Sequence, residues 1–294
     1  MLVVSKRKSI PAKVKSILRE EVGFGCPVKN CGNPYLEYHH FDPPVNVRAH
    51  NEPEGMIALC AQHHKKADGD AYTTEQLHEL KKDKINARLV KGNLDWLRQD
   101  LLAVIGGVFY YETPIPVLID NHEVISIKRD NDGYLRLSVN MLSVTAEERL
   151  IIDSNSWEII GEPIDLRSPP QGKELEVNYA NGDMLYLRFL VINSAEEANK
   201  KYNTNVFVGN NDINFPITAV EINMSIGGTT INFSPSKTSF ASNTIKGGLM
   251  SKCGVGLSLA NTGVNWLQNP KWKLQSKFEV VDNSNIINVK FGRK

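Results

Sequence analysis

Residues 26–68 read CPVKNCGNPYLEYHHFDPPVNVRAHNEPEGMIALCAQHHKKAD, and this stretch decides how the first part of the chain folds. It holds three of the four cysteines of the chain, as a Cys-x4-Cys pair and a later Cys-x2-His-His group. Zinc prefers four thiolate or imidazole ligands in a tetrahedral arrangement. A turn that supplies two thiolates and a helix start that supplies two more groups match this preference. We therefore expect a structural zinc here, worth on the order of 10 kcal/mol of folding free energy.

The zinc ligands predicted from the spacing are Cys26, Cys31, Cys60 and His63. Cys60 and His63 are three residues apart in a segment expected to be helical, which places them on one face. His64 is four residues from Cys60 and could reach the same ion, so the choice between the two histidines stays open. Three buried cysteines that cluster without a metal are the alternative to a zinc site.

The segments between these ligands have recognisable local patterns. Residues 35–39 alternate like a strand, and the following Pro43-Pro44 ends it because proline cannot donate to a strand ladder. Residues 45–55 read as a loop, and the apolar run 56–59 leads into the helix that carries the second ligand group. Ile10-Pro11 with later apolar residues predicts an earlier short helix, and Thr73 or Thr74 caps a later one.

The doublet His39-His40 stands outside the zinc set. Adjacent residues of a strand point to opposite sides, so the two imidazoles are expected to have different roles. One can bind a second, hard divalent ion while the other, a neutral histidine, takes a proton from water. A second structural zinc, or a zinc finger without activity, is the alternative interpretation.

The rest of the chain has a different sequence pattern. From Gly106 onward, short β-rich runs recur between turn signals, including Asn181-Gly182 between two alternating segments. We expect an α+β protein: a small zinc-stapled domain at 1–82, a helical linker at 83–105, and a larger all-β, sandwich-like domain at 106–294. A last strand is expected within 278–291. No catalytic constellation is visible in this larger part.

Composition restricts the class of protein. The chain of 294 residues is 41% hydrophobic and 23% charged, as in globular proteins and unlike disordered chains. No apolar run reaches the roughly 18 residues of a membrane helix, so we expect no membrane segment. The cysteines do not resemble a disulfide framework, which favours the reducing cytoplasm. Basic residues crowd ahead of the first cysteine, which suits phosphate contacts or simply a solvated terminus.

The stretch CPVKNC…LEYHHFDPP…HNEPEGMIALCAQHHKKAD resembles the HNH nucleases with their ββα-metal motif, in the subtype with a zinc knuckle. The resemblance covers about the first quarter of the chain. It implies phosphodiester hydrolysis with one Mg²⁺ or Mn²⁺ ion, with His40 as general base and with His39 and His64 as ligands of that catalytic ion. It also implies Cys26, Cys31, Cys60 and His63 as the zinc set, and DNA as the partner.

One position departs from the family pattern. The family's central Asn, fifteen residues after the base, corresponds to Gly55. Asn51 is the nearest replacement and is taken as a catalytic residue, and His50 or Glu54 could assist; otherwise activity is impaired. Arg48, Lys65 and Lys66 are expected to contact phosphates, although each alone could be a solvated charge.

Two functions follow from these observations. The first is a regulated DNA endonuclease of the restriction or anti-phage type, whose β domain senses a small-molecule or protein activator; this role rests on analogy. The second is a non-catalytic zinc protein that binds nucleic acid. A nuclease that acts only within a protein complex is a third possibility, and a homo-oligomer stays open.

Overall fold

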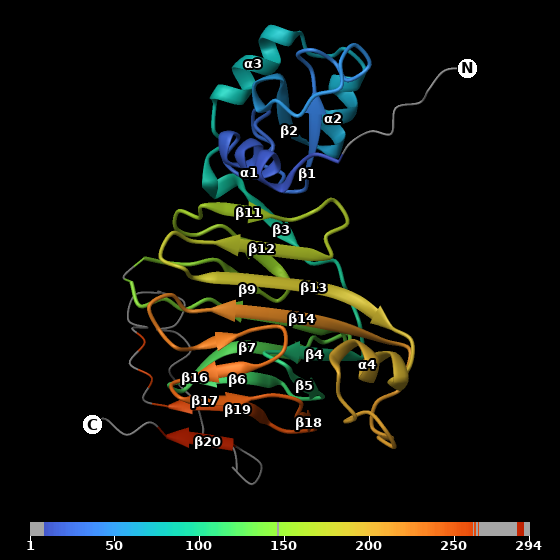
Figure 1. The fold of residues 1–294 in the computed structure, drawn as a ribbon, viewed down its shortest axis with the longest axis vertical. Coiled ribbons are helices and arrows are strands. Elements are labelled where there is room, and N and C mark those ends of the chain that lie inside the picture. Colours follow the sequence, from blue (N-terminus) through green and yellow to red (C-terminus); the bar gives the residue numbers. More distant parts are fainter. Residues whose placement is uncertain (1–8, 146, 261, 263, 265–286, 291–294) are drawn as a thin grey trace. The chain divides into compact units, whose positions relative to one another are not determined.

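The computed structural model describes residues 9–145, 147–260, 262, 264 and 287–290 of the chain (Figure 1). The chain divides into two compact units. Unit 1 comprises residues 1–92 together with the inserted segment 164–172, and unit 2 comprises residues 93–163 and 173–294. Unit 1 therefore matches the expected small domain in position, but it continues ten residues further and includes a segment from the middle of the chain.

Unit 1 is a β-hairpin surrounded by short helices. Its elements in chain order are α1 (Ala12–Glu21), β1 (Leu36–His40), the 3-10 turn η1 (Pro53–Gly55), β2 (Met56–Cys60), α2 (Ala61–Asp68), α3 (Thr74–Lys82), the 3-10 turn η2 (Ala87–Leu89) and, from the inserted segment, β11 (Asp165–Arg167). Every residue of β2 is buried. The hairpin core, with Leu18 of α1 and Leu77 of α3, is the apolar centre of the unit.

Local sequence accounts for the start of each element. Pro11 directly precedes α1, where its missing N–H is not needed. Thr73 caps α3, accepting from the backbone N–H of Gln76, whose side chain in turn accepts from the N–H of Thr73. Strands β1 and β2 pair antiparallel, with His39 opposite Ile57 and His40 opposite Met56. The helices and the hairpin strand predicted for this unit are thus confirmed.

The segment 83–105 is not helical, contrary to the prediction. After α3 it contains only the turn η2, the short strand β3 (Lys91–Asn93) and the strand β4 (Leu101–Ile105). The apolar residues of this segment belong to separate elements. Leu89 is exposed, whereas Leu94 is buried and its N–H donates to the carbonyl of Asn155 in unit 2.

The inserted segment 164–172 is anchored in unit 1 by a buried ion pair. The guanidinium of Arg19 in α1 makes a two-pronged contact with Asp165, at 2.9 and 2.6 Å, and also donates to the hydroxyl of Tyr38 at 2.7 Å. Tyr35 forms a parallel bridge with Ser168. Arg19 is 5% exposed, and a buried charge of this kind depends on its partners. The spacing of 146 residues between the partners gave no signal in the sequence.

Unit 2 consists mainly of two sheets. One runs β19-β6-β7-β8-β9-β10, with β20 beside β19. The other is centred on β14, which pairs with β13, β15 and, in parallel, β4. Besides β4, the strands are β5 (Val108–Tyr111), β6 (Ile115–Ile119), β7 (His122–Arg129), β8 (Leu135–Asn140), β9 (Ile151–Asp153), β10 (Ser156–Glu158), β12 (Glu174–Asn178), β13 (Met184–Ile192), β14 (Ile217–Ser225), β15 (Asn232–Phe233), β16 (Thr238–Phe240), β17 (Asn243–Ile245), β18 (Leu249–Ser251), β19 (Val255–Ala260) and β20 (Ile287–Lys290).

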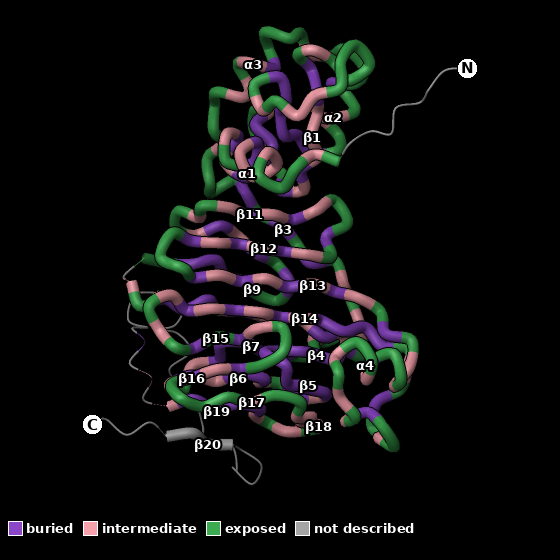
Figure 2. The backbone as a smooth tube through the Cα atoms, in the orientation of Figure 1, coloured by how far each residue is buried: buried purple, intermediate pink, exposed green. Residues whose placement is uncertain are grey.

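Burial in unit 2 alternates along the strands, as Figure 2 shows for β12 and β13. Each of these strands therefore has one buried face, which explains the apolar–polar alternation of the sequence. The turn at Asn181-Gly182 joins β12 to β13 as predicted, with Gly182 at φ +89°. Helix α4 (Ala195–Tyr202) follows β13. Of the strand expected within 278–291, only β20 lies among the described residues.

The described part of the chain is a mixed α+β structure composed mostly of sheet, with four α-helices, and this part of the fold prediction is confirmed. None of its helices combines the length and apolar character that crossing a membrane would require.

Candidate metal centres

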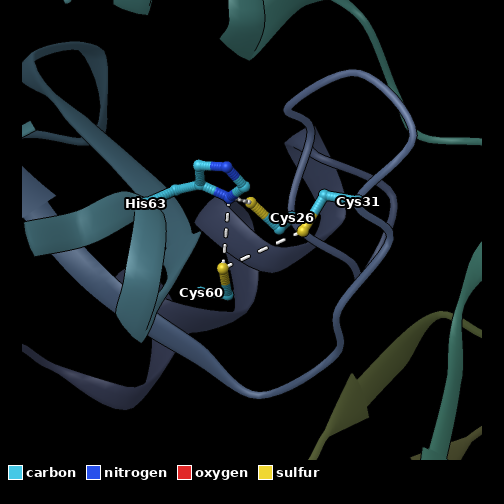
Figure 3. Close-up of side chains that lie close together, drawn as sticks. All are labelled: Cys26, Cys31, Cys60 and His63. Atoms are coloured by element: carbon cyan, nitrogen blue, oxygen red, sulfur yellow. Dashed lines mark hydrogen bonds between the residues drawn. The ribbon is translucent and has the colours of Figure 1, made fainter. Parts of the chain in front are cut away.

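Four metal-binding side chains meet in unit 1 (Figure 3). Nδ1 of His63 lies 3.3 Å from the sulfur of Cys26 and 3.2 Å from that of Cys60, and the sulfurs of Cys31 and Cys60 are 3.9 Å apart. Ligand atoms around a tetrahedral zinc stand about 3.5 to 3.8 Å apart, given Zn–S and Zn–N bonds of about 2.3 and 2.0 Å. The four predicted ligands are thus brought together in a form compatible with a structural zinc site.

The local backbone explains why these side chains converge. A tight turn follows Cys26, in which the N–H of Cys31 donates to the carbonyl of Val28 and that of Gly32 to the carbonyl of Cys26. Gly32 has φ +60°, which favours glycine. Cys60 ends β2 and is the N-cap of α2, with extended backbone angles, so it precedes the helix that was expected to contain it. His63 lies in the first turn of α2, and its side chain faces back toward Cys60.

Zinc binding at this cluster would release protons. Burial raises the pKa of the Cys26 thiol well above its usual range and raises that of Cys31. Burial, together with the charge of Lys66, lowers the pKa of His63. At neutral pH the metal-free site therefore holds protons on these two thiols and a neutral imidazole on His63. Zinc binds thiolates, so it must displace those protons. All four cysteines of the chain are free of disulfides.

Zinc affinity should consequently increase with pH. Each thiol that loses its proton on zinc binding lowers the apparent Kd about tenfold per pH unit below its pKa, so Cys26 and Cys31 alone predict a fall of at least about a hundredfold per pH unit. Competition with a zinc indicator between pH 6 and 8 measures this slope. The affinity increases with pH because protons and zinc compete for the same sulfur atoms. Cys253→Ser is the matched control, because Cys253 lies in unit 2 and should leave the slope unchanged. A pH-independent affinity would contradict the assignment.

A second cluster combines His39, His64 and Asp68. Nδ1 of His39 lies 3.1 Å, and Nε2 of His64 3.8 Å, from the same carboxylate oxygen of Asp68. Ligand atoms around an octahedral Mg²⁺ at about 2.1 Å stand about 3 Å apart, so small adjustments would let all three bind one ion. Burial, and then the neighbouring His64, lowers the pKa of His39 and favours the neutral ring that a metal needs.

Glu37 orients the second cluster. Its carboxylate lies 2.6 Å from Nδ1 of His64. A carboxylate accepts, so Nδ1 carries the proton and Nε2 presents its lone pair toward Asp68 and His39. Such carboxylate–histidine pairs commonly fix the tautomer of a metal-binding histidine.

Asp68 and Glu37 were missed in the sequence. The available signal was their spacing, because Asp68 is one helical turn after His64, and Glu37 shares a strand face with His39.

The two members of the histidine doublet contact different groups, as their adjacent strand positions require. His39 faces Asp68 of α2, whereas Nε2 of His40 lies 3.1 Å from the main-chain oxygen of His50. His40 is only 6% exposed. Asn51, taken as a catalytic residue in place of the family Asn, makes no side-chain hydrogen bond within the described part of the chain. The structure brings His50, its neighbour, to His40 instead.

The three expected phosphate-binding residues differ in their surroundings. Arg48 is held by both carboxylate oxygens of Glu52, each at 2.8 Å, so a phosphate would have to compete with that pair. Lys65 and Lys66 are exposed on α2, directly after His63 and His64 in sequence. They are free of ion pairs to any described residue. Their exposure suits contact with an anionic partner.

In comparisons with known proteins, no family model, no curated protein and no solved structure matches this chain.

Proposed function

We propose that the chain is a metal-dependent DNA endonuclease of the HNH type. The observation that carries the proposal is the cluster of His39, His64 and Asp68, which strand β1 and helix α2 form, with His40 next to His39 in β1. The sulfur-rich cluster of Cys26, Cys31, Cys60 and His63 would hold a structural zinc. A zinc-stapled hairpin and helix with a second, separate ligand set is what the ββα-metal resemblance leads one to expect.

The residues of the second cluster fit a hard divalent ion such as Mg²⁺ or Mn²⁺. His39, His64 and Asp68 would hold it, with Glu37 fixing the ring of His64. The ion would supply charge stabilisation at the scissile phosphate and at the leaving oxygen. Two imidazoles and one carboxylate leave part of a six-ligand shell for water and a phosphate oxygen.

His40 would act as the general base. The main-chain oxygen of His50 can only accept, so the proton of the His40 ring resides on Nε2 and the lone pair on Nδ1. Nδ1 would take a proton from the attacking water. Because His40 is 6% exposed, catalysis requires that the complex with DNA admit a water molecule to this ring. Lys65 and Lys66 would contact phosphates, and Arg48 would do so on leaving Glu52.

Plasmid cleavage with Mg²⁺ or Mn²⁺ tests the proposal. His40→Ala should lower the cleavage rate by about 10²- to 10⁴-fold, the usual contribution of a general base. His122→Ala, a histidine of unit 2, is the matched control and should cleave like the unchanged protein. Absence of cleavage under every metal and salt condition, together with salt-sensitive DNA binding, would instead favour the non-catalytic zinc protein.

Unit 2 would regulate this activity in a cytoplasmic restriction or anti-phage role, by binding a small-molecule or protein activator. An unregulated nuclease endangers its own cell, which is the reason for this part of the proposal. Cleavage measured with and without candidate activators, alongside the mass in solution, separates a self-sufficient enzyme from one that needs a partner or a second copy.

A further inference from the structure

The loop between β1 and β2 is organised around the ring of His50. Its Nε2 lies 3.0 Å from the main-chain oxygen of Pro43, and its Nδ1 accepts from the N–H of Glu52 at 3.2 Å. Since a carbonyl accepts and an N–H donates, His50 carries its proton on Nε2 and a lone pair on Nδ1. One side chain therefore ties the start of the loop to its end.

The main-chain oxygen of the same residue receives the hydrogen bond from Nε2 of His40, at 3.1 Å. The two rings also meet edge to face, with centroids 5.1 Å apart and planes at 89°. His50 thus contacts His40 twice, through its carbonyl and through its ring. Any shift of the His50 backbone would change both contacts.

The surroundings of His50 leave the loop little freedom. The N–H groups of Phe41 and Asp42 both donate to the carbonyl of Gly55, at 2.9 and 3.2 Å. A Cβ at Gly55 would lie 1.8 Å from the oxygen of Asp42 and 2.9 Å from Cε1 of His50. The His50 ring and the Asp42 backbone therefore fill the space that a side chain at position 55 would need.

We propose that His50 is a positioning residue for His40. Its carbonyl holds the proton of the His40 ring on Nε2 and leaves the lone pair on Nδ1, and its own ring, bonded at both nitrogens, holds that carbonyl in place. The inference rests on the proposed function, in which His40 is the general base. It gives a specific role to His50, which the sequence had suggested beside Asn51 as a residue that could assist.

The test compares three substitutions of His50 in the full-length, zinc-loaded protein. His50→Ala removes both ring contacts, and kcat for plasmid cleavage should fall by about 10- to 100-fold, as for other residues that orient a reacting histidine. KM for DNA should stay within about twofold, because His50 acts on His40 and not on the substrate. His50→Asn keeps an acceptor near Nδ1, and His50→Gln keeps a donor near Nε2. Both should recover part of the lost kcat.

A second readout does not depend on activity. Nitrogen-15 NMR of the imidazoles should find His40 protonated on Nε2 in the unchanged protein and in a mixture of tautomers in His50→Ala. Val47→Ala is the matched control in the same loop, because Val47 is 73% exposed, and it should keep both kcat and tautomer. If His50→Ala does not fold, His50→Asn and His50→Gln are compared with the unchanged protein in kcat and in the tautomer of His40.

The outcomes separate the two proposals. An inactive unchanged protein would overturn the proposed function. An active protein in which the His50 variants keep kcat within twofold, or in which His40 stays protonated on Nε2 alone in His50→Ala, would overturn the positioning role of His50 and leave the nuclease standing.

Discussion

His63→Ala should unfold unit 1, whereas His64→Ala should leave a folded protein that does not cleave DNA. The two histidines are adjacent in α2 but belong to different clusters: His63 contacts the sulfurs of Cys26 and Cys60, and His64 faces Asp68. A structural zinc site contributes folding free energy on the order of 10 kcal/mol, and loss of one ligand removes a large part of it. Circular dichroism measures folding, metal analysis measures zinc content, and the plasmid assay measures DNA cleavage.

Lys65→Ala is the matched control for folding. Lys65 follows His64 directly in α2 and is exposed, so this variant should keep the unfolding midpoint and zinc content of the unchanged protein. The opposite pattern, with His64→Ala unfolded and His63→Ala stable but inactive, would exchange the two assignments. Equal loss of zinc in both variants would mean that one ion uses both rings.

Gly55→Ala should destabilise unit 1 by about 3 kcal/mol, at the upper end of the usual cost of overfilling a packed site. The added Cβ would lie 1.8 Å from the oxygen of Asp42, a main-chain atom that cannot rotate away. The strand end after His40 would have to move, because the carbonyl of Gly55 accepts from both Phe41 and Asp42. Thermal unfolding should show a midpoint lower by about 12 to 24 °C, because 1 kcal/mol shifts the midpoint of a unit of about 100 residues by about 4 to 8 °C. Cleavage should be reduced.

Gly69→Ala provides the glycine control. Its Cβ would meet only the carbonyl oxygens of Lys65 and Lys66 at 3.6 Å, an ordinary contact, and Gly69 has φ −99°. We expect a change within about 0.5 kcal/mol. If Gly55→Ala were equally well tolerated, the loop would be looser than its contacts imply, and the positioning role of His50 would lose its support. Gly55→Asn, which introduces the residue that the HNH resemblance implies at this position, should destabilise unit 1 for the same steric reason.

Much of unit 1 could be predicted because its signals are local. Proline before α1, the capping box at Thr73 and the turn that joins Cys26 to Cys31 act within a few residues. The hairpin Asn181-Gly182 of unit 2 is of the same kind. The prediction of a helical linker at 83–105 was wrong. Apolar residues at helical spacing also occur where separate strands and turns each bury one residue. Spacing alone does not separate these cases.

The other contacts of the candidate site depend on how separate elements pack against one another. Asp68 and Glu37 become part of the second cluster only because α2 packs on one face of β1. His50 becomes a contact of His40 through its main-chain carbonyl, an atom that every residue has. Asp165 reaches Arg19 across 146 residues of chain, at a distance that no local pattern encodes.

The sequence by itself determined which side chains are able to bind metal, where the hairpin and its helices begin, and that the larger part of the chain is built from strands. These properties depend on residue chemistry and on neighbours within one turn. Only the tertiary structure decided how the histidines divide between two clusters, which carboxylates join them, and why position 55 has no side chain. The physical reason is that these outcomes depend on packing between elements, where a difference of one or two ångströms separates a ligand from a neighbour and a contact from a clash.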